Sequence, residues 1–227
     1  PELRIYVTPL SYDPMNPGIP LSHPKSFAQE LAKATGRFYT QGMPEDTRAR
    51  NVEALTADEL LAQARITADE NRRQFRYVLD RFDDGLLFYY FGHVDQVSHV
   101  MWRSMDPGHP AFIAADANYR TVIGDLYVEM DAVVGQAMAA LGPEDLLVVM
   151  SDHGFAPWRR AMNVNSWLRD HGYLAVTNAR AAAEPGLAGV DWAKTRAYAV
   201  GLNGVYLNLQ GRESKGIVPP AEAARLA

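Results

Sequence analysis

Two pairs of aspartate and histidine residues have the types and spacing that could bind a metal ion. Asp95 and His99 are four residues apart, and Asp152 and His153 are adjacent. On one turn of a helix, side chains at positions i and i+4 point the same way and can grip one cation. Neighbours in a regular strand point to opposite faces. The second pair can therefore share a target only where the chain leaves the strand, and the following Gly154 permits such a turn.

Each pair by itself also fits an ordinary structural role. The first could lie on a solvated helix face, and the aspartate of the second could cap backbone N–H groups at a strand end. The two pairs together are stronger evidence for a metal site than either pair alone, because each follows the same pattern of an acidic turn, a short apolar run and a loop. The pattern spans residues 83–99 and 143–155. It favours one shared metal site over two unrelated pairs.

The apolar runs in this pattern predict strands. Residues 86–91 and 146–150 are continuous apolar runs bounded by turn residues, typical of parallel strands covered on both faces. Between them, apolar residues recur at three- and four-residue steps over residues 119–141, which predicts an amphipathic helix. The resulting βαβ unit ends both strands at one edge of a sheet, where ligands bind in open α/β folds. We therefore predict an α/β fold, with αβα layers around a mostly parallel sheet, that brings both pairs together at the strand ends.

Further elements are predicted on either side of this unit. Residues 26–34 and 163–170 look helical, and residues 56–59 form a capping box ahead of a long helix reaching about residue 82. Residues 173–177 could be a strand, and residues 196–209 predict a hairpin or an irregular strand pair.

The organisation predicted for residues 1–227 is a single partial catalytic α/β domain. Residues 1–24 are rich in proline and predict an irregular surface segment, and residues 178–189, rich in alanine and glycine, predict a flexible linker.

Composition excludes several classes of protein. The 227 residues are 48% hydrophobic and 22% charged, which is ordinary for a globular protein. A net charge of −5 argues against binding of a nucleic-acid duplex, and no apolar run approaches the roughly 18 to 20 residues of a membrane span. Because the chain has no cysteine, a metal ion must be bound by histidine, carboxylate or other oxygen ligands, which suit zinc, manganese or iron.

The ordered motifs resemble the alkaline phosphatase superfamily, and in particular its type I phosphodiesterase/nucleotide pyrophosphatase branch. The resemblance rests on Asp95 and His99 followed by residues 149–155, which read Val-Met-Ser-Asp-His-Gly-Phe. It extends from about residue 21 to residue 218 and includes residues 36–47, 165–168 and 206–209.

The resemblance implies a hydrolase that acts on a small phosphate-ester or nucleotide substrate through a covalent phospho-enzyme. It implies two divalent metal ions, zinc in most members with manganese as the alternative. Asp152 and His153 would bind one ion, and Asp95 and His99 the other. A pair of ions needs about three protein ligands each, so these four residues are too few, and further ligands are expected elsewhere.

The sequence also departs from the family pattern. Nothing before Asp95 has the context of the family's threonine or serine nucleophile, and nothing after His153 resembles its later Gly-Thr-His segment. The chain is therefore expected to be an internal fragment of the catalytic domain and to be inactive by itself. The alternatives are a mutase or a sulfatase on the same scaffold, or a catalytically inert α/β domain.

Overall fold

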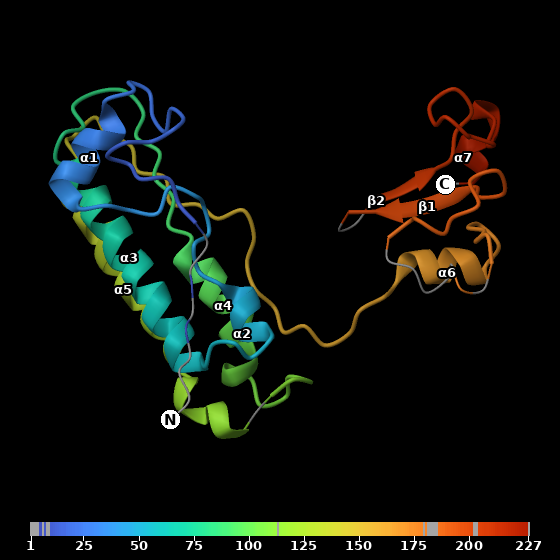
Figure 1. Cartoon of the computed structure of the whole chain (residues 1–227), viewed down its shortest axis with the longest axis horizontal. Helices are drawn as coiled ribbons and strands as arrows, with labels where there is room; N and C mark the ends of the chain where they lie inside the picture. The colour runs from blue at the N-terminus through green and yellow to red at the C-terminus, as the bar shows by residue number, and fades with distance from the viewer. Residues whose placement is uncertain are drawn as a thin grey trace. The chain divides into compact units, whose positions relative to one another are not determined.

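The computed structural model describes residues 5, 7, 10–112, 114–178, 180, 186–201 and 204–226, without the side chains of residues 115–117. The chain divides into two compact units, Pro1–Arg159 and Arg160–Ala227 (Figure 1). Each unit has a buried apolar cluster of its own. The single domain predicted for residues 1–227 stays a prediction.

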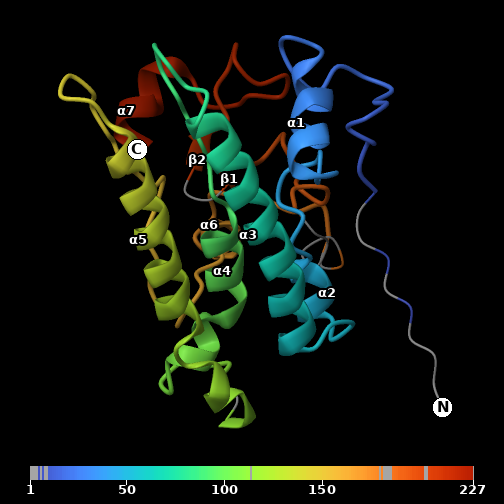
Figure 2. The ribbon, with the colours of Figure 1, turned by 90° about the vertical axis from the view of Figure 1, so that its left-hand side faces the viewer.

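The first unit is helical in the residues described. Three helices, α3, α4 and α5, pack against one another, and α1 lies against α3 (Figure 2). The elements of this unit are α1 (Phe27–Thr35), α2 (Thr47–Asn51), α3 (Ala57–Leu79), α4 (His93–Met105), the 3-10 helix η1 (Ala114–Tyr119) and α5 (Val122–Ala140).

The capping box predicted for the long helix is confirmed. The Thr56 hydroxyl accepts from the Glu59 backbone N–H at 3.2 Å, and the Glu59 carboxylate accepts from the Thr56 backbone N–H at 2.8 Å. These bonds satisfy two N–H groups that would otherwise lack a partner at the helix start. The helices predicted at residues 26–34 and 119–141 are also present, as α1 and α5.

The core of the first unit lies where α3 meets α4. Apolar side chains spaced by three and four residues on both helices form one buried cluster, and residues of η1 and α5 pack against it. An ion pair between Arg72 and Glu129, at 2.7 Å, ties α3 to α5. The cluster consists of Ala57, Leu60, Ala64, Val97, Val100 and Met101. Helix α4, which carries the first Asp/His pair, is therefore anchored on its apolar face.

The strands predicted at residues 86–91 and 146–150 do not form in the described part of the chain. Tyr89 and Phe91 pack on Phe75 of α3, with ring centroids 5.1 and 5.4 Å apart, while Leu86 and Phe88 are 92% and 72% exposed. This alternation is that of a strand with one covered face. No neighbouring segment supplies the backbone hydrogen bonds of a ladder, which is why the strand prediction is wrong here. The αβα layers stay a prediction.

The second unit combines a short helix with a two-stranded sheet. Strands β1 (Ala197–Val200) and β2 (Gly204–Leu207) pair antiparallel, which confirms the predicted hairpin. The Asn165 side chain of α6 (Val164–Asp170) hydrogen-bonds both the N–H and the C=O of Ala199. It satisfies backbone groups at the edge of β1, as a neighbouring strand would. The 3-10 helix η3 (Pro220–Glu222) and α7 (Ala223–Leu226) follow.

Three further predictions have mixed outcomes. The strand predicted at residues 173–177 is wrong, because only Val176 forms a bridge there, to Val190. Residues 10–24 contain turns and bends without a helix or strand, while residues 1–4, 6, 8 and 9 of the predicted surface segment lie outside the described residues. Residues 179 and 181–185 of the predicted linker also lie outside them. Among the described residues, no helix is both long enough and apolar enough to cross a membrane.

Candidate metal centre

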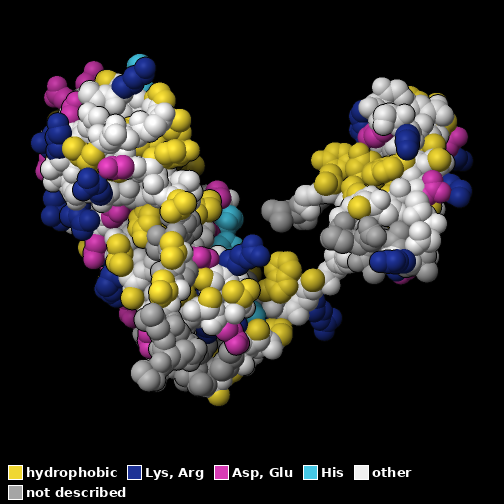
Figure 3. Space-filling view, viewed as in Figure 1, with side chains coloured by type: hydrophobic (Ala, Val, Ile, Leu, Met, Phe, Trp, Pro, Cys, Tyr) yellow, Lys and Arg dark blue, Asp and Glu magenta, His cyan; other side chains and the backbone are white. Residues whose placement is uncertain are grey.

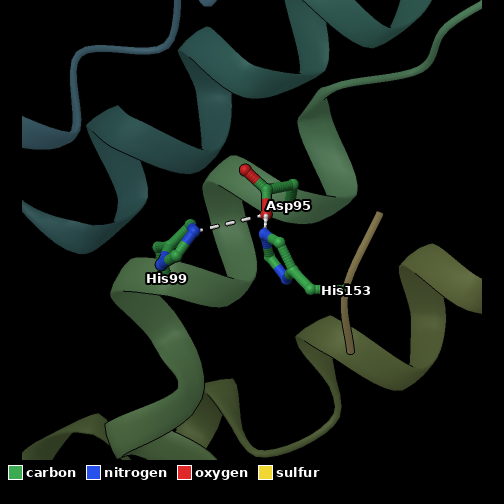
Figure 4. A group of neighbouring side chains, drawn as sticks. All are labelled: Asp95, His99 and His153. Atoms are coloured by element: carbon green, nitrogen blue, oxygen red, sulfur yellow. Dashed lines mark ion pairs between the residues drawn. The ribbon is translucent and has the colours of Figure 1, made fainter. Parts of the chain in front are cut away.

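Three of the four predicted ligands converge in the first unit. Asp95 lies in the first turn of α4 and His99 one turn later, with 3.2 Å between Asp95 Oδ1 and His99 Nε2. His153, from the loop after residues 146–150, places its Nε2 3.5 Å from the same oxygen. The three ligand atoms all lie within 4.8 Å of one another (Figure 4). The i, i+4 geometry is confirmed on a helix, whereas a loop position for the first pair is wrong, because α4 already begins at His93.

The hydrogen bonds around the three residues fit a metal site. Asp95 Oδ1 is buried and forms no hydrogen bond in the described part of the chain, although both imidazoles face it. The other carboxylate oxygen accepts from the Gln96 side chain at 2.9 Å. His153 Nδ1 lies 3.0 Å from the Gly154 carbonyl, so in the neutral imidazole Nδ1 donates its proton there and Nε2 carries the lone pair. Two imidazole nitrogens and one carboxylate oxygen form a donor set that suits zinc.

Asp152, the fourth predicted ligand, does not join this cluster. Its side chain is 85% exposed, and its Oδ2 lies 3.9 Å from His153 Nε2. Adjacent side chains in an irregular segment have no fixed common direction, so the loop turns the imidazole toward Asp95 and leaves the carboxylate in solvent. Asp152 is thus beside the three converging residues without contributing an atom to them.

Residues 11–226 match the family model for type I phosphodiesterase / nucleotide pyrophosphatase. The chain belongs to this family. Searches of curated proteins and of solved structures found no match. The family comprises hydrolases of phosphate-ester or nucleotide substrates, with an α/β fold, and membership confirms the resemblance drawn from the motifs.

Acidic residues surround the converging ligands of this family member. Burial raises the pKa of Glu45, and the nearby Asp95 carboxylate raises it further. The pKa of the Tyr90 phenol is also raised, by burial first and then by Asp95, Asp152 and Glu45. Burial is the larger cause of both shifts, and the smaller charge effects show that the Asp95, Asp152 and Glu45 carboxylates lie close enough to act on one region, which favours a cation. Sequence reasoning missed Glu45, because nothing in residues 36–47 indicates that this carboxylate is buried.

A cavity of about 350 Å³ opens beside His99 and His153. Trp102 and Phe155 stack on its wall, with ring centroids 5.6 Å apart and planes at 19°. Arg103 also lines it, and was missed by sequence reasoning because an arginine on a helix resembles a solvated surface charge. In the space-filling view, histidine, cationic and hydrophobic side chains gather on this surface of the first unit (Figure 3).

Two further histidines differ in their relation to this site. His109 lines the cavity on a loop that Arg159 secures through an ion pair of 2.8 Å with Asp106. His93 lies apart from the three ligands, in a small cavity between α3 and α5. It is 1% exposed, and burial lowers its pKa.

Proposed function

We propose that this protein is a metal-dependent phosphoric-ester hydrolase in which Asp95, His99 and His153 bind a divalent ion. The observation that carries the proposal is the convergence of three ligand atoms within 4.8 Å in a member of a phosphodiesterase/pyrophosphatase family. The favoured ion is zinc, with manganese as the alternative, because the donors are imidazole and carboxylate and the chain has no thiolate.

The proposal includes a second ion, with Asp152 among its ligands. The Asp152 carboxylate is exposed and lies next to His153, so it is free to bind an ion beside the first one. Two ions would need more ligands than these four residues supply. Glu45, buried and close to Asp95, is a further carboxylate on this side of the site.

Bound metal ions would supply charge stabilisation to the transferred phosphoryl group and would activate the nucleophile. The residues of this chain hold the site in place around them. Helix α4 orients Asp95 and His99, and the Gly154 carbonyl fixes the tautomer of His153. The aromatic wall of Trp102 and Phe155 removes part of the cavity from water, which strengthens electrostatic interactions inside it.

Turnover is proposed for the full-length protein, through a covalent phospho-enzyme, because no nucleophile is identified in these residues. The test is hydrolysis of bis(p-nitrophenyl) phosphate by the full-length protein and its variants. Asp152→Asn and His99→Ala should each abolish turnover while circular dichroism shows an unchanged fold. Residues 1–227 alone should show no turnover. Full activity in either variant, or sustained zinc-dependent hydrolysis by residues 1–227, would contradict the proposal.

Matched controls separate a loss of ligands from a general effect of charge. Asp83→Asn and His23→Ala make the same chemical changes at exposed positions outside the cluster, and both should retain turnover.

The distances of 3.2 and 3.5 Å would also permit ion pairs between protonated imidazoles and Asp95. A zinc titration distinguishes the two arrangements, because an ion-pair cluster would not bind zinc tightly.

A further inference from the structure

Arg103 continues the row of candidate ligands along α4. Asp95, His99 and Arg103 follow one another at four-residue steps on this helix. Side chains at that spacing lie on the same helix face, and each step advances about 6 Å along the axis. The guanidinium therefore lies on the metal-binding side of the helix, one turn beyond His99.

The guanidinium of Arg103 has no protein partner among the described residues. The side chain is half-buried, its Nε is buried without a hydrogen bond, and no described carboxylate forms an ion pair with it. Two other arginines of this unit that are only partly exposed or lie near the site are paired with a carboxylate, Arg72 with Glu129 at 2.7 Å and Arg159 with Asp106 at 2.8 Å. A cation partly removed from water without a counter-charge is costly, so Arg103 has the properties of a residue that binds an anion.

The cavity connects this cation to the candidate metal site. His99 and His153 line the cavity together with Arg103, and Trp102 and Phe155 stack on its wall. Trp102 Nε1 is also buried without a hydrogen-bond partner in the described residues. A ligand held at the metal site by one phosphoryl group can extend toward Arg103.

We propose that Arg103 binds a second phosphoryl group of the substrate, next to the one held at the metal site. The site then favours substrates with two adjacent phosphoryl groups over singly charged phosphodiesters. The planar fork of donors on arginine suits bidentate binding of a phosphoryl group. Arg103 is thus assigned as a specificity-determining residue, and this assignment rests on the function proposed above.

The test compares the binding of AMP and ADP, which differ by one phosphoryl group, to zinc-loaded residues 1–227. Isothermal titration calorimetry measures both affinities while a metal buffer holds the free zinc concentration constant. The wild-type chain should bind ADP more tightly than AMP. Because a charge-assisted hydrogen bond contributes about 1.5 to 3 kcal/mol, Arg103→Gln should weaken ADP binding by roughly ten- to a hundredfold. AMP binding should change by less than about threefold, and Arg103→Lys should recover part of the loss because it retains the charge.

Controls and contrary results separate this inference from the proposed function. Arg120→Gln removes the same charge from an exposed position outside the cavity and should leave both affinities unchanged. Three results would overturn this inference alone. Arg103→Gln could lower the affinities for AMP and ADP equally, or lower neither of them. The wild-type chain could also bind zinc without binding ADP. A wild-type chain that binds no zinc would overturn the proposed function and this inference with it.

Discussion

The two Asp/His pairs of the candidate site differ in how the chain holds them. Asp95 and His99 lie on α4, and both side chains contribute to the cluster. Asp152 and His153 lie in an irregular segment, where the imidazole joins the cluster and the carboxylate remains 85% exposed. Both side chains of the pair on α4 therefore belong to the cluster, whereas only one side chain of the pair in the loop does.

Regular secondary structure fixes the direction of a side chain, whereas in a loop that direction depends on individual bonds. The packing of α4 against α3 and α5 determines where the face with Asp95 and His99 points. In the loop, the Ser151 hydroxyl donates to the His153 carbonyl, and the His153 ring donates to Gly154. These local bonds orient His153 without constraining its neighbour, Asp152.

We expect the greatest change in zinc affinity to separate His153 from its neighbour Asp152. In residues 1–227, His153→Ala should lower the affinity for the first zinc ion by about 100-fold or more, because even partners of metal ligands typically contribute about 10- to 100-fold. Asp152→Asn should lower it by less than about tenfold, since the carboxylate lies outside the cluster. Competition with a fluorescent zinc chelator measures both affinities.

One result of the same titration would contradict the roles assigned to Asp152 and His153. An equal loss of zinc affinity in the two variants would mean that both Asp152 and His153 bind the first ion, contrary to the observed geometry. Asp83→Asn is the control, because its side chain is exposed in a turn away from the cluster, and it should leave the affinity unchanged.

A smaller effect is expected from Glu70, a buried residue of helix α3. Glu70 of α3 accepts the Tyr39 backbone N–H at 2.9 Å, and burial raises its pKa above the ordinary value of 4.5. The folded state therefore binds this proton more tightly than the unfolded state. The free energy of unfolding should fall as the pH rises from about 4.5 through the raised pKa. Glu70→Gln retains an acceptor without the charge and should be more stable than the wild type at pH 7.

Urea unfolding at several pH values measures this difference. The advantage of Glu70→Gln should disappear below about pH 4.5, where the wild-type carboxyl is protonated in both states. Glu144→Gln, at an exposed turn position, should give no such pH dependence. A stability difference for Glu70→Gln that does not change with pH would contradict the role assigned to burial.

How much the sequence predicts depends on whether the signal is local. Helix α3 is predictable because its capping box lies within four residues, and Asp95 and His99 are predictable because helical spacing fixes their relation. Residues 86–91 have the composition of a strand, but a strand also needs a partner, and an apolar run does not specify one. The burial of Glu45 depends on contacts between distant segments, and the direction of Asp152 is not fixed by any regular element, so neither could be predicted.

The most direct test of the central claim is zinc X-ray absorption spectroscopy of residues 1–227 loaded with one equivalent of zinc, beside His99→Ala. The wild-type spectrum should show two imidazole ligands at about 2.0 to 2.1 Å and oxygen ligands at about 2.0 to 2.2 Å. The variant should have one imidazole fewer. A zinc ion coordinated by water alone, or a spectrum that is the same in His99→Ala, would contradict the assignment of Asp95, His99 and His153 as a metal site.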